Sequence, residues 1–101
     1  MLRMRKISDG NRSRFEIIAQ ILTELRIPTG KTNIMSNCNM SFIQLGPYLK
    51  FMGSNDLIQT DAIVGKVTYQ RTETGRKFLE LYDKMALLLD PDTSISFLVR
   101  Q

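Results

Sequence analysis

The chain has 101 residues, a length that suits a single domain. It contains no histidine, and its one cysteine, Cys38, can form neither an internal disulfide nor a cysteine zinc cluster. A histidine general base, a histidine-activated nucleophile and a histidine metal ligand are therefore excluded, so we expect no catalytic residue, no metal site and no cofactor. Cys38 is expected to be a small buried residue in a protein of a reducing compartment.

Basic side chains outnumber acidic ones by 14 to 10, and the excess is concentrated at the start of the chain. The first fourteen residues hold one acidic side chain, Asp9, and these basic ones: Arg3, Arg5, Lys6, Arg12 and Arg14. We interpret residues 1–11 as a basic N-terminal arm that can follow a phosphate backbone, because each neutralised phosphate releases condensed counterions. The alternative is a solvated terminus without a partner.

No apolar run approaches the ~20 residues that span a membrane, and no apolar stretch follows the basic start, as a secretory signal requires. We therefore expect a cytoplasmic protein with no membrane partner. The chain shows no internal repeat and no linker, so residues 1–101 are expected to form one domain.

The first helix is predicted to begin near residues 11–13 and to run to about Arg26. Ser13 followed by Glu16 forms a capping-box pattern at its start, and Pro28 specifies its end. Its apolar stripe comprises Phe15, Ile17, Ile18, Ile21, Leu22 and Leu25.

Two further helices follow in close succession. The loop at residues 28–30 precedes a short second helix, Thr32–Cys38, for which Thr29 or Thr32 is the predicted cap. A turn at residues 37–39 leads into the third helix, which begins after Ser41, with Gln44 completing a capping box. Apolar residues then recur at helical spacing, and a glycine is expected to close the helix. The residues are Phe42, Leu45, Leu49 and Met52, and the closing glycine is Gly53.

Gly46-Pro47 interrupts this third helix. Proline removes the hydrogen bond to the carbonyl of Ile43 and costs about 3 kcal/mol in a helix interior. We therefore expect either a kink at Pro47 or a later start near Leu45 or Gly46, which would place Pro47 in the first turn, where proline is tolerated.

A β hairpin follows the third helix. A strand begins at residues 57–60, residues 61–65 form the predicted hairpin loop, and residues 66–71 alternate polar with apolar as a half-buried return strand does. The loop before the second helix is expected to add a short third strand. Two helices joined by a tight turn and followed by a hairpin describe a winged helix-turn-helix, mainly α with a small β hairpin (α+β). In such folds the second of the two helices usually enters the DNA major groove.

The last helix is predicted at residues 72–89, with Thr72 as its N-cap, and a tail follows at residues 90–101. Its apolar stripe comprises Phe78, Leu81, Tyr82, Met85, Leu88 and Leu89. One small domain buries such a stripe poorly, so we expect a homodimer that pairs through this C-terminal helix. The alternative is that the helix folds back on its own domain with the help of the apolar tail.

The ordered set of segments resembles archaeal winged helix-turn-helix proteins, namely the ArnR-like transcriptional regulators and the related chromatin proteins that dimerise through a C-terminal coiled coil. The resemblance covers roughly residues 5–89. It is carried by Arg12–Leu22, Gly30–Met35, Asn39–Leu45, Tyr48-Leu49, Leu57-Ile58, Tyr69, Thr72–Gly75 and Phe78-Leu79.

The resemblance implies a dimeric binder of double-stranded DNA in archaeal cytoplasm, either a transcriptional regulator or a nucleoid component. Family members usually carry lysine or arginine in the middle of the third helix, where this chain has Gly46-Pro47. The alternative function is therefore a protein-interaction module that has lost DNA binding.

Candidate DNA contacts follow from side-chain chemistry. Gln44 suits an adenine edge, although it equally suits the capping of Ser41, and Lys50 suits guanine or a phosphate. Polar groups at a helix N-terminus suit phosphate oxygens. The predicted DNA-binding residues are Arg5, Lys6, Lys31, Thr32, Asn39, Ser41, Ile43, Gln44, Lys50, Lys66 and Arg71.

Overall fold

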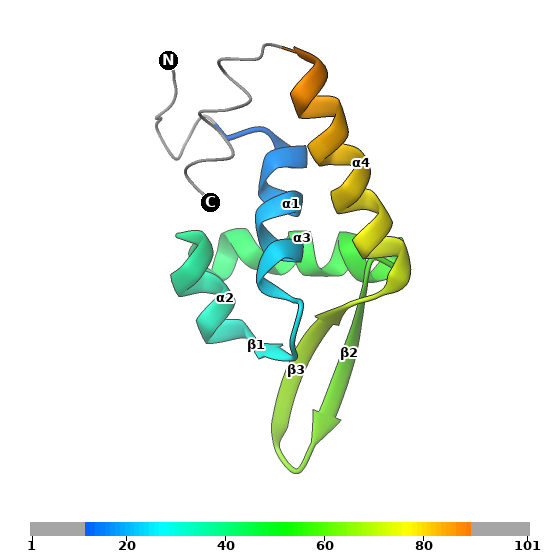
Figure 1. The fold of residues 1–101 in the computed structure, drawn as a ribbon. Helices are drawn as coiled ribbons and strands as arrows, with labels where there is room; N and C mark the ends of the chain where they lie inside the picture. Colours follow the sequence, from blue (N-terminus) through cyan, green and yellow to red (C-terminus); the bar gives the residue numbers. More distant parts are fainter. Residues whose placement is uncertain (1–11, 90–101) are drawn as a thin grey trace.

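The computed structural model describes residues 12–89. The elements, in chain order, are α1 (Arg14–Glu24), β1 (Thr29–Gly30), α2 (Lys31–Cys38), α3 (Phe42–Ser54), β2 (Ile58–Ile63), β3 (Lys66–Arg71) and α4 (Glu73–Leu89). The helices gather into one body, and the β2–β3 hairpin projects from it (Figure 1). This arrangement confirms the predicted α+β architecture. The predicted N-terminal arm (1–11) and the C-terminal tail (90–101) lie outside the described residues.

The sheet has three antiparallel strands in the order β1-β3-β2, so the predicted third strand before α2 is confirmed. The predicted hairpin loop at residues 61–65 was too long, because β2 continues to Ile63 and pairs there with Lys66. The turn is therefore Val64-Gly65 alone, with φ angles of 44° and 75°. Positive φ at both central residues matches the right-handed twist of the strands, which allows pairing to continue up to a two-residue turn.

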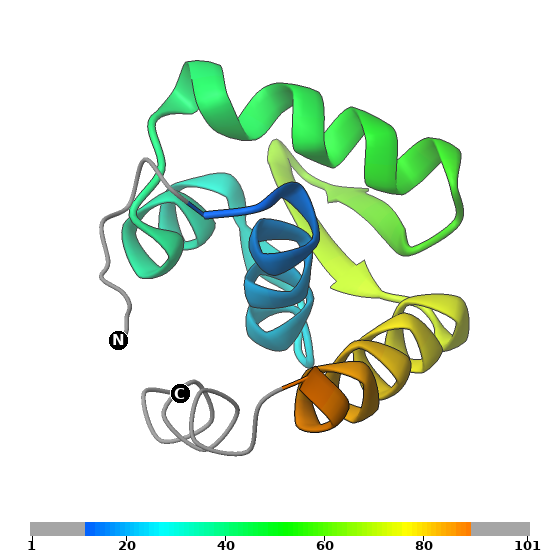
Figure 2. The same cartoon turned by 90° about the horizontal axis from the view of Figure 1, so that it is seen from above.

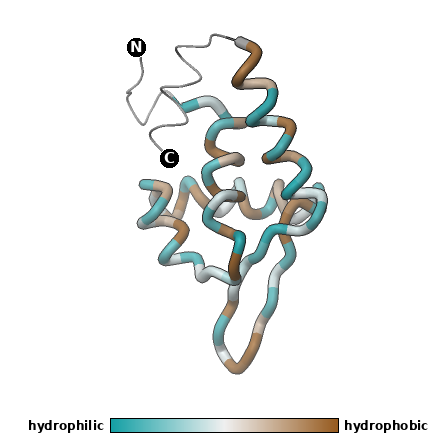
Figure 3. The backbone as a smooth tube through the Cα atoms, in the orientation of Figure 1, coloured by the Kyte–Doolittle hydropathy of each residue, from teal (hydrophilic) through white to brown (hydrophobic). Residues whose placement is uncertain are grey.

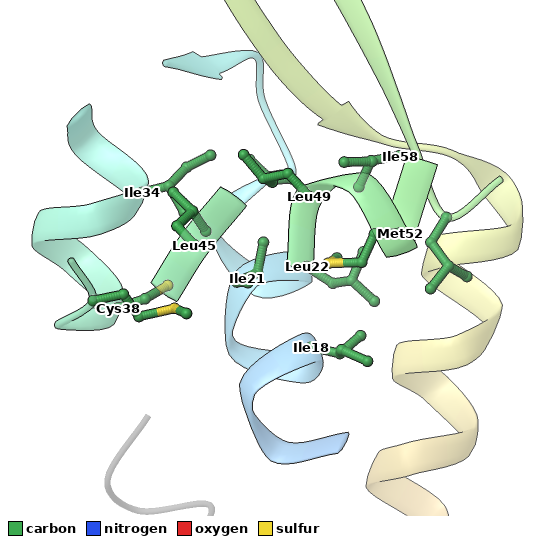
Figure 4. Packing of buried hydrophobic residues seen from close by; sticks show 12 residues of the cluster. Ile18, Ile21, Leu22, Ile34, Cys38, Leu45, Leu49, Met52 and Ile58 are labelled. Carbon is green, nitrogen blue, oxygen red and sulfur yellow. The ribbon is translucent and has the colours of Figure 1, made fainter. Parts of the chain in front are cut away.

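One apolar core joins the first three helices to the base of the hairpin. It is built from buried side chains of α1, α2 and α3, together with residues of the connections between elements and the first residue of β2 (Figure 4). Its members are Ile18, Ile21, Leu22, Leu25, Ile34, Cys38, Met40, Leu45, Leu49, Met52, Leu57 and Ile58. The predicted burial of Cys38 is confirmed. Phe15, by contrast, is 59% exposed, and its ring contacts that of Phe78 on α4 at 6.4 Å between centroids.

Helix α1 begins where its capping residue predicts. The hydroxyl of Ser13 accepts a hydrogen bond from the amide of Glu16 at 3.1 Å. The helix ends at Glu24 with Leu25 as its C-cap, so the predicted end near Arg26 was slightly late.

The predicted threonine cap of α2 was wrong. Gly30 occupies the N-cap position and makes no side-chain capping bond. The hydroxyl of Thr29 instead donates to the carbonyl oxygens of Glu24 and Ile27, at 3.2 and 2.9 Å, and so holds the preceding loop. Thr32 already lies inside the helix, where its hydroxyl cannot cap the start.

Helix α3 begins at Phe42, directly after the predicted cap Ser41, so the alternative of a later start forced by Pro47 was wrong. The capping box is complete: the Gln44 amide donates to the Ser41 hydroxyl at 3.1 Å, and the Ser41 amide donates to the Gln44 side-chain oxygen at 2.9 Å. These bonds satisfy the amides at the helix start and fix it there, although Pro47 removes one bond further along. Figure 2 shows α3 as one continuous helix along one side of the domain.

The predicted glycine C-cap of α3 was also wrong, because Gly53 lies within the helix. Asn55 is the C-cap, and its side-chain amide donates to the carbonyl of Phe51 at 2.9 Å. Asp56 follows with φ 61°, so a left-handed residue does end this segment, three positions after the glycine.

Helix α4 begins at the predicted cap. The hydroxyl of Thr72 accepts a hydrogen bond from the amide of Gly75 at 3.1 Å and donates to the carbonyl of Asp56. The amide of Thr72 donates to the carbonyl of Leu57 at 3.0 Å. These bonds tie the start of α4 to the chain between α3 and β2, so the hairpin and the last helix share one anchored base.

Candidate nucleic-acid interface

Helix α3 presents one face to the core and the opposite face to solvent. Leu45, Leu49 and Met52 are buried, whereas Ile43 is 83% exposed and Lys50 is exposed. No aspartate or glutamate occurs in α3, so no carboxylate on this helix opposes an approaching polyanion. The structure therefore places the predicted contacts Ile43 and Lys50 on an outward face that a groove could receive.

Gln44 and Ser41 are both occupied by helix capping. The side-chain oxygen of Gln44 accepts a hydrogen bond from the Ser41 amide, which is the predicted capping role and the alternative to adenine recognition. A bidentate contact to adenine needs that oxygen, so the capping bond competes with base reading. The hydroxyl of Ser41 remains at the helix start, where outward amides favour a phosphate.

Asn39 lies in the predicted turn between α2 and α3, with φ 55°, a left-handed geometry that asparagine tolerates. Its carbonyl and that of Cys38 accept hydrogen bonds from the guanidinium of Arg12, at 3.3 and 2.7 Å. A cation at a helix C-terminus interacts favourably with the helix dipole. Arg12, one of the basic residues near the start of the chain, is thus hydrogen-bonded to the turn of the helix-turn-helix.

A cation–π contact connects the starts of α2 and α3, the two helices of the helix-turn-helix. The ammonium of Lys31, at the start of α2, lies 4.6 Å from the ring centroid of Phe42, at the start of α3. This distance is typical of a cation–π contact. The predicted position of Phe42 in the buried stripe was wrong, because the ring is 60% exposed and lies beneath Lys31 instead. Thr32, beside Lys31, is exposed as well.

The hairpin carries one predicted contact at its tip and another at its base. Lys66 is exposed and directly follows the turn. Arg71 pairs with Ile58 at the base, where its guanidinium donates to the carbonyl of Leu22 at 3.3 Å and its amide donates to that of Leu25 at 3.0 Å. Arg71 therefore holds the end of α1, and its side chain is directed toward the body of the domain.

The tip of the β2–β3 hairpin, which is the wing of this fold, is apolar, and the sequence did not lead us to expect this. Ile63, Val64 and Val67 are 70%, 98% and 47% exposed, and Figure 3 shows this tip as hydrophobic. The available signal was the run Ala62-Ile63-Val64, which had been read as loop. Because a strand alternates its faces, a hydrophobic run at the free end of a hairpin cannot all be buried.

The last turns of α4 expose a second apolar stripe. Leu81, Met85 and Leu88 are 65%, 47% and 84% exposed, and their spacing places them on one face of the helix. Of the other predicted interface residues, Phe78 packs against the core and Tyr82 is half-buried, while nothing is described for the Leu89 side chain. Arg76 forms ion pairs with Glu73 and Glu80 on its own helix.

The buried thiol is not placed for chemistry. Burial raises the pKa of Cys38 to about 11, with the charge of Glu24 acting in the same direction and that of Arg12 opposing it. The thiolate, which is the nucleophilic form, is therefore scarce at neutral pH. Between residues 12 and 89, no group of three histidine, cysteine, aspartate or glutamate side chains could hold a metal ion.

Residues 11–89 match the family model of winged helix-turn-helix domains, and the chain belongs to this family. A solved relative is Sso10a-2, described as a DNA-binding protein from Sulfolobus solfataricus. The crystal structure of that protein superposes with a TM-score of 0.68 at 19% sequence identity, covering 89% of this chain and 99% of that chain. The resemblance to archaeal winged helix-turn-helix proteins is thereby confirmed. No curated protein matches the chain.

Membership of the winged helix-turn-helix family indicates a non-enzymatic role. In the part of the chain that the structure describes, no helix has the length and apolar character needed to cross a membrane.

Proposed function

We propose that this protein binds double-stranded DNA, as a transcriptional regulator or a nucleoid-associated protein of the cytoplasm. The outward face of α3 carries the proposal: it belongs to a helix-turn-helix, lacks acidic residues and presents Ile43 and Lys50 to solvent. The second helix of a helix-turn-helix, here α3, fits the major groove, which is about 12 Å wide. The family match and the DNA-binding relative support the proposal.

Phosphate contacts would supply most of the affinity. The start of α2 offers Lys31 and Thr32, the turn and α3 offer Asn39, Ser41 and Lys50, and the wing offers Lys66. The N-terminal arm would add Arg5 and Lys6, which lie outside the described residues. We propose supporting roles for the two predicted residues that are engaged within the domain: Gln44 fixes the start of α3, and Arg71 fixes the base of the wing.

We further propose a homodimer in which α4 pairs with its counterpart. Leu81, Met85 and Leu88 follow i, i+4, i+7 spacing, which is the pattern of a helix–helix seam. Exposure of all three residues leaves apolar surface that a second copy would cover. Two copies related by a two-fold axis would present two α3 helices to one duplex.

A protein-interaction module is the competing function, favoured by the exposed rings of Phe42 and Phe51 on a helix with one lysine. Fluorescence anisotropy on mixed-sequence duplexes at 50–300 mM salt separates the two functions. DNA binding predicts a log–log salt slope of about −0.9 for each phosphate contacted. Absence of binding at the lowest salt concentration would remove the DNA proposal and leave the interaction module.

Single charge removals locate the contacts. Lys50→Gln and Lys66→Gln should each weaken binding and reduce the salt slope by about 1. Lys77→Gln is the matched control, because Lys77 is an exposed lysine on α4, outside the proposed surface. Equal losses for all three variants would show that net charge, and not this surface, governs binding.

A further inference from the structure

An apolar ridge runs along the outward face of α3. Ile43, Pro47 and Phe51 are exposed and follow one another at intervals of four residues, which places them side by side on one face of the helix. Ile43 is 83% exposed and Phe51 is 53% exposed. Their side chains add little to the core, which α3 reaches through its opposite face, so stability of the domain does not account for them.

The same face is poor in groups that read bases by hydrogen bonding. No carboxylate of α3 is present to accept from the amino group of cytosine. The side-chain oxygen of Gln44 is bonded to the Ser41 amide. Pro47 has no amide hydrogen to offer. Within the described face of α3, Lys50 is the charged side chain, and it lies seven residues after Ile43, about 10 Å along the axis.

One group in the major groove matches an apolar ridge. The C5-methyl group of thymine projects into that groove, and apolar side chains recognise it by contact. A ridge that extends over two helical turns can cover methyl groups on neighbouring base pairs, while Lys50 contacts a phosphate or a purine at the ridge's edge. Lys50 beside the ridge and the lack of acidic residues in α3 are compatible with the approach of a polyanion such as DNA.

We propose that Ile43 and Phe51 recognise thymine methyl groups, so that this protein prefers A·T-rich duplexes. The inference rests on the proposed DNA binding and adds its sequence preference. Recognition by methyl contact can be distinguished from a preference for a narrow minor groove. Removal of the methyl group alone should abolish recognition by methyl contact.

The test uses the full chain and four alternating duplexes of equal length, measured by fluorescence anisotropy at one low salt concentration. Duplexes of A·T pairs are compared with the same duplexes carrying uracil, which lacks the C5-methyl group. Duplexes of G·C pairs are compared with duplexes carrying 5-methylcytosine, which adds that group. We expect uracil to weaken binding about fourfold for each contacted methyl, the factor for burial of one methylene-sized group, and 5-methylcytosine to strengthen it.

Two variants tie the effect to the ridge. Ile43→Ala should lose the part of the thymine preference that Ile43 supplies, about fourfold, and keep the part that Phe51 supplies. Ile27→Ala is the matched control: Ile27 is 68% exposed, lies between α1 and β1, and should retain the full thymine preference. Light scattering on both variants checks that the subunit number is unchanged.

The outcomes are distinct. Equal affinity of the native protein for thymine and uracil duplexes overturns the methyl proposal and leaves the proposed DNA binding intact. A change of subunit number in Ile43→Ala also overturns the methyl proposal, because it would show that the ridge contacts a second copy of the chain. Failure to bind any of the four duplexes overturns both proposals.

Discussion

Gly75 lies so close to Leu57 that a β-carbon at position 75 would overlap the carbonyl oxygen of Leu57. The same β-carbon would lie 3.1 Å from the Cδ2 atom of Leu22. Glycine thus permits α4 to pack against the connection between α3 and β2. We expect Gly75→Ala to lower the free energy of unfolding by about 1–3 kcal/mol, the usual cost of overpacking, measured by urea denaturation.

Gly53→Ala is the matched control, because a β-carbon at this helical position meets no atom within 4 Å. Alanine should raise stability there by about 1 kcal/mol, since it favours the helix. Opposite signs for the two variants would confirm close packing at Gly75, and equal signs would contradict it.

The turn at the wing tip contains a β-branched residue in left-handed geometry. Val64 has φ 44°, which is unfavourable for valine and natural for asparagine, and Gly65 follows it. Val64→Asn creates the Asn-Gly pair preferred by this turn and should raise the free energy of unfolding by about 1 kcal/mol. Val67→Asn makes the same change within β3 and should give no gain. Thermal denaturation of both variants measures the difference; a stability gain of similar size at both positions would contradict the strain at Val64.

Alkaline pH should act on stability through Cys38. Burial raises the pKa of its thiol from 9.0 to about 11 in the folded protein. The folded pKa exceeds the unfolded one, so the stabilising contribution is complete below pH 9 and is lost as pH rises toward 11. The loss should approach about 2 kcal/mol. Urea denaturation at several pH values should show this decline for the native protein and a smaller one for Cys38→Ala; parallel declines would assign it to other groups.

Charge on the exposed stripe of α4 should separate the proposed dimer. Leu81→Glu with Met85→Glu places two carboxylates where two apolar seams would meet, and like charges buried there are costly. We expect monomers by light scattering with the helical circular dichroism signal retained. Leu87→Glu is the control, because Leu87 is 51% exposed but lies on another face of the helix. If the double variant stays dimeric, the subunits pair through a different surface.

Local signals in the sequence predicted local structure well. The caps formed by Ser13, Ser41 and Thr72 were correctly identified, because a cap depends on residues within one helical turn. The predicted start of α3 after Ser41 was confirmed, whereas the alternative of a later start, drawn from the cost of Pro47 alone, was wrong. Val64-Gly65 lacks the asparagine that usually marks a two-residue turn, so the hairpin was read as shorter than it is.

The candidate interface was harder to predict than the fold, because tertiary contacts decide which charges remain available. The guanidinium of Arg71 donates a hydrogen bond to the carbonyl of Leu22 in α1, which is 49 positions earlier in the sequence. Arg12 is bonded to carbonyls 26 and 27 positions ahead. Phe42 matched the spacing of the core stripe, but its ring lies beneath Lys31. The sequence pattern of a single helix does not show which of its side chains will bond to distant parts of the domain and which will remain exposed.

The clasp of Arg12 on the carbonyls of Cys38 and Asn39 fixes the root of the N-terminal segment beside the turn of the helix-turn-helix. Lys6 and Arg5 precede this root by six and seven residues, so a chain at full extension keeps both within about 25 Å of it. Because the segment is tethered, its cations would meet DNA bound to the same molecule at a high effective concentration and would need no separate encounter from solution. Under the proposed DNA binding, a duplex on α3 would lie beside the point from which the chain that carries those two cations departs.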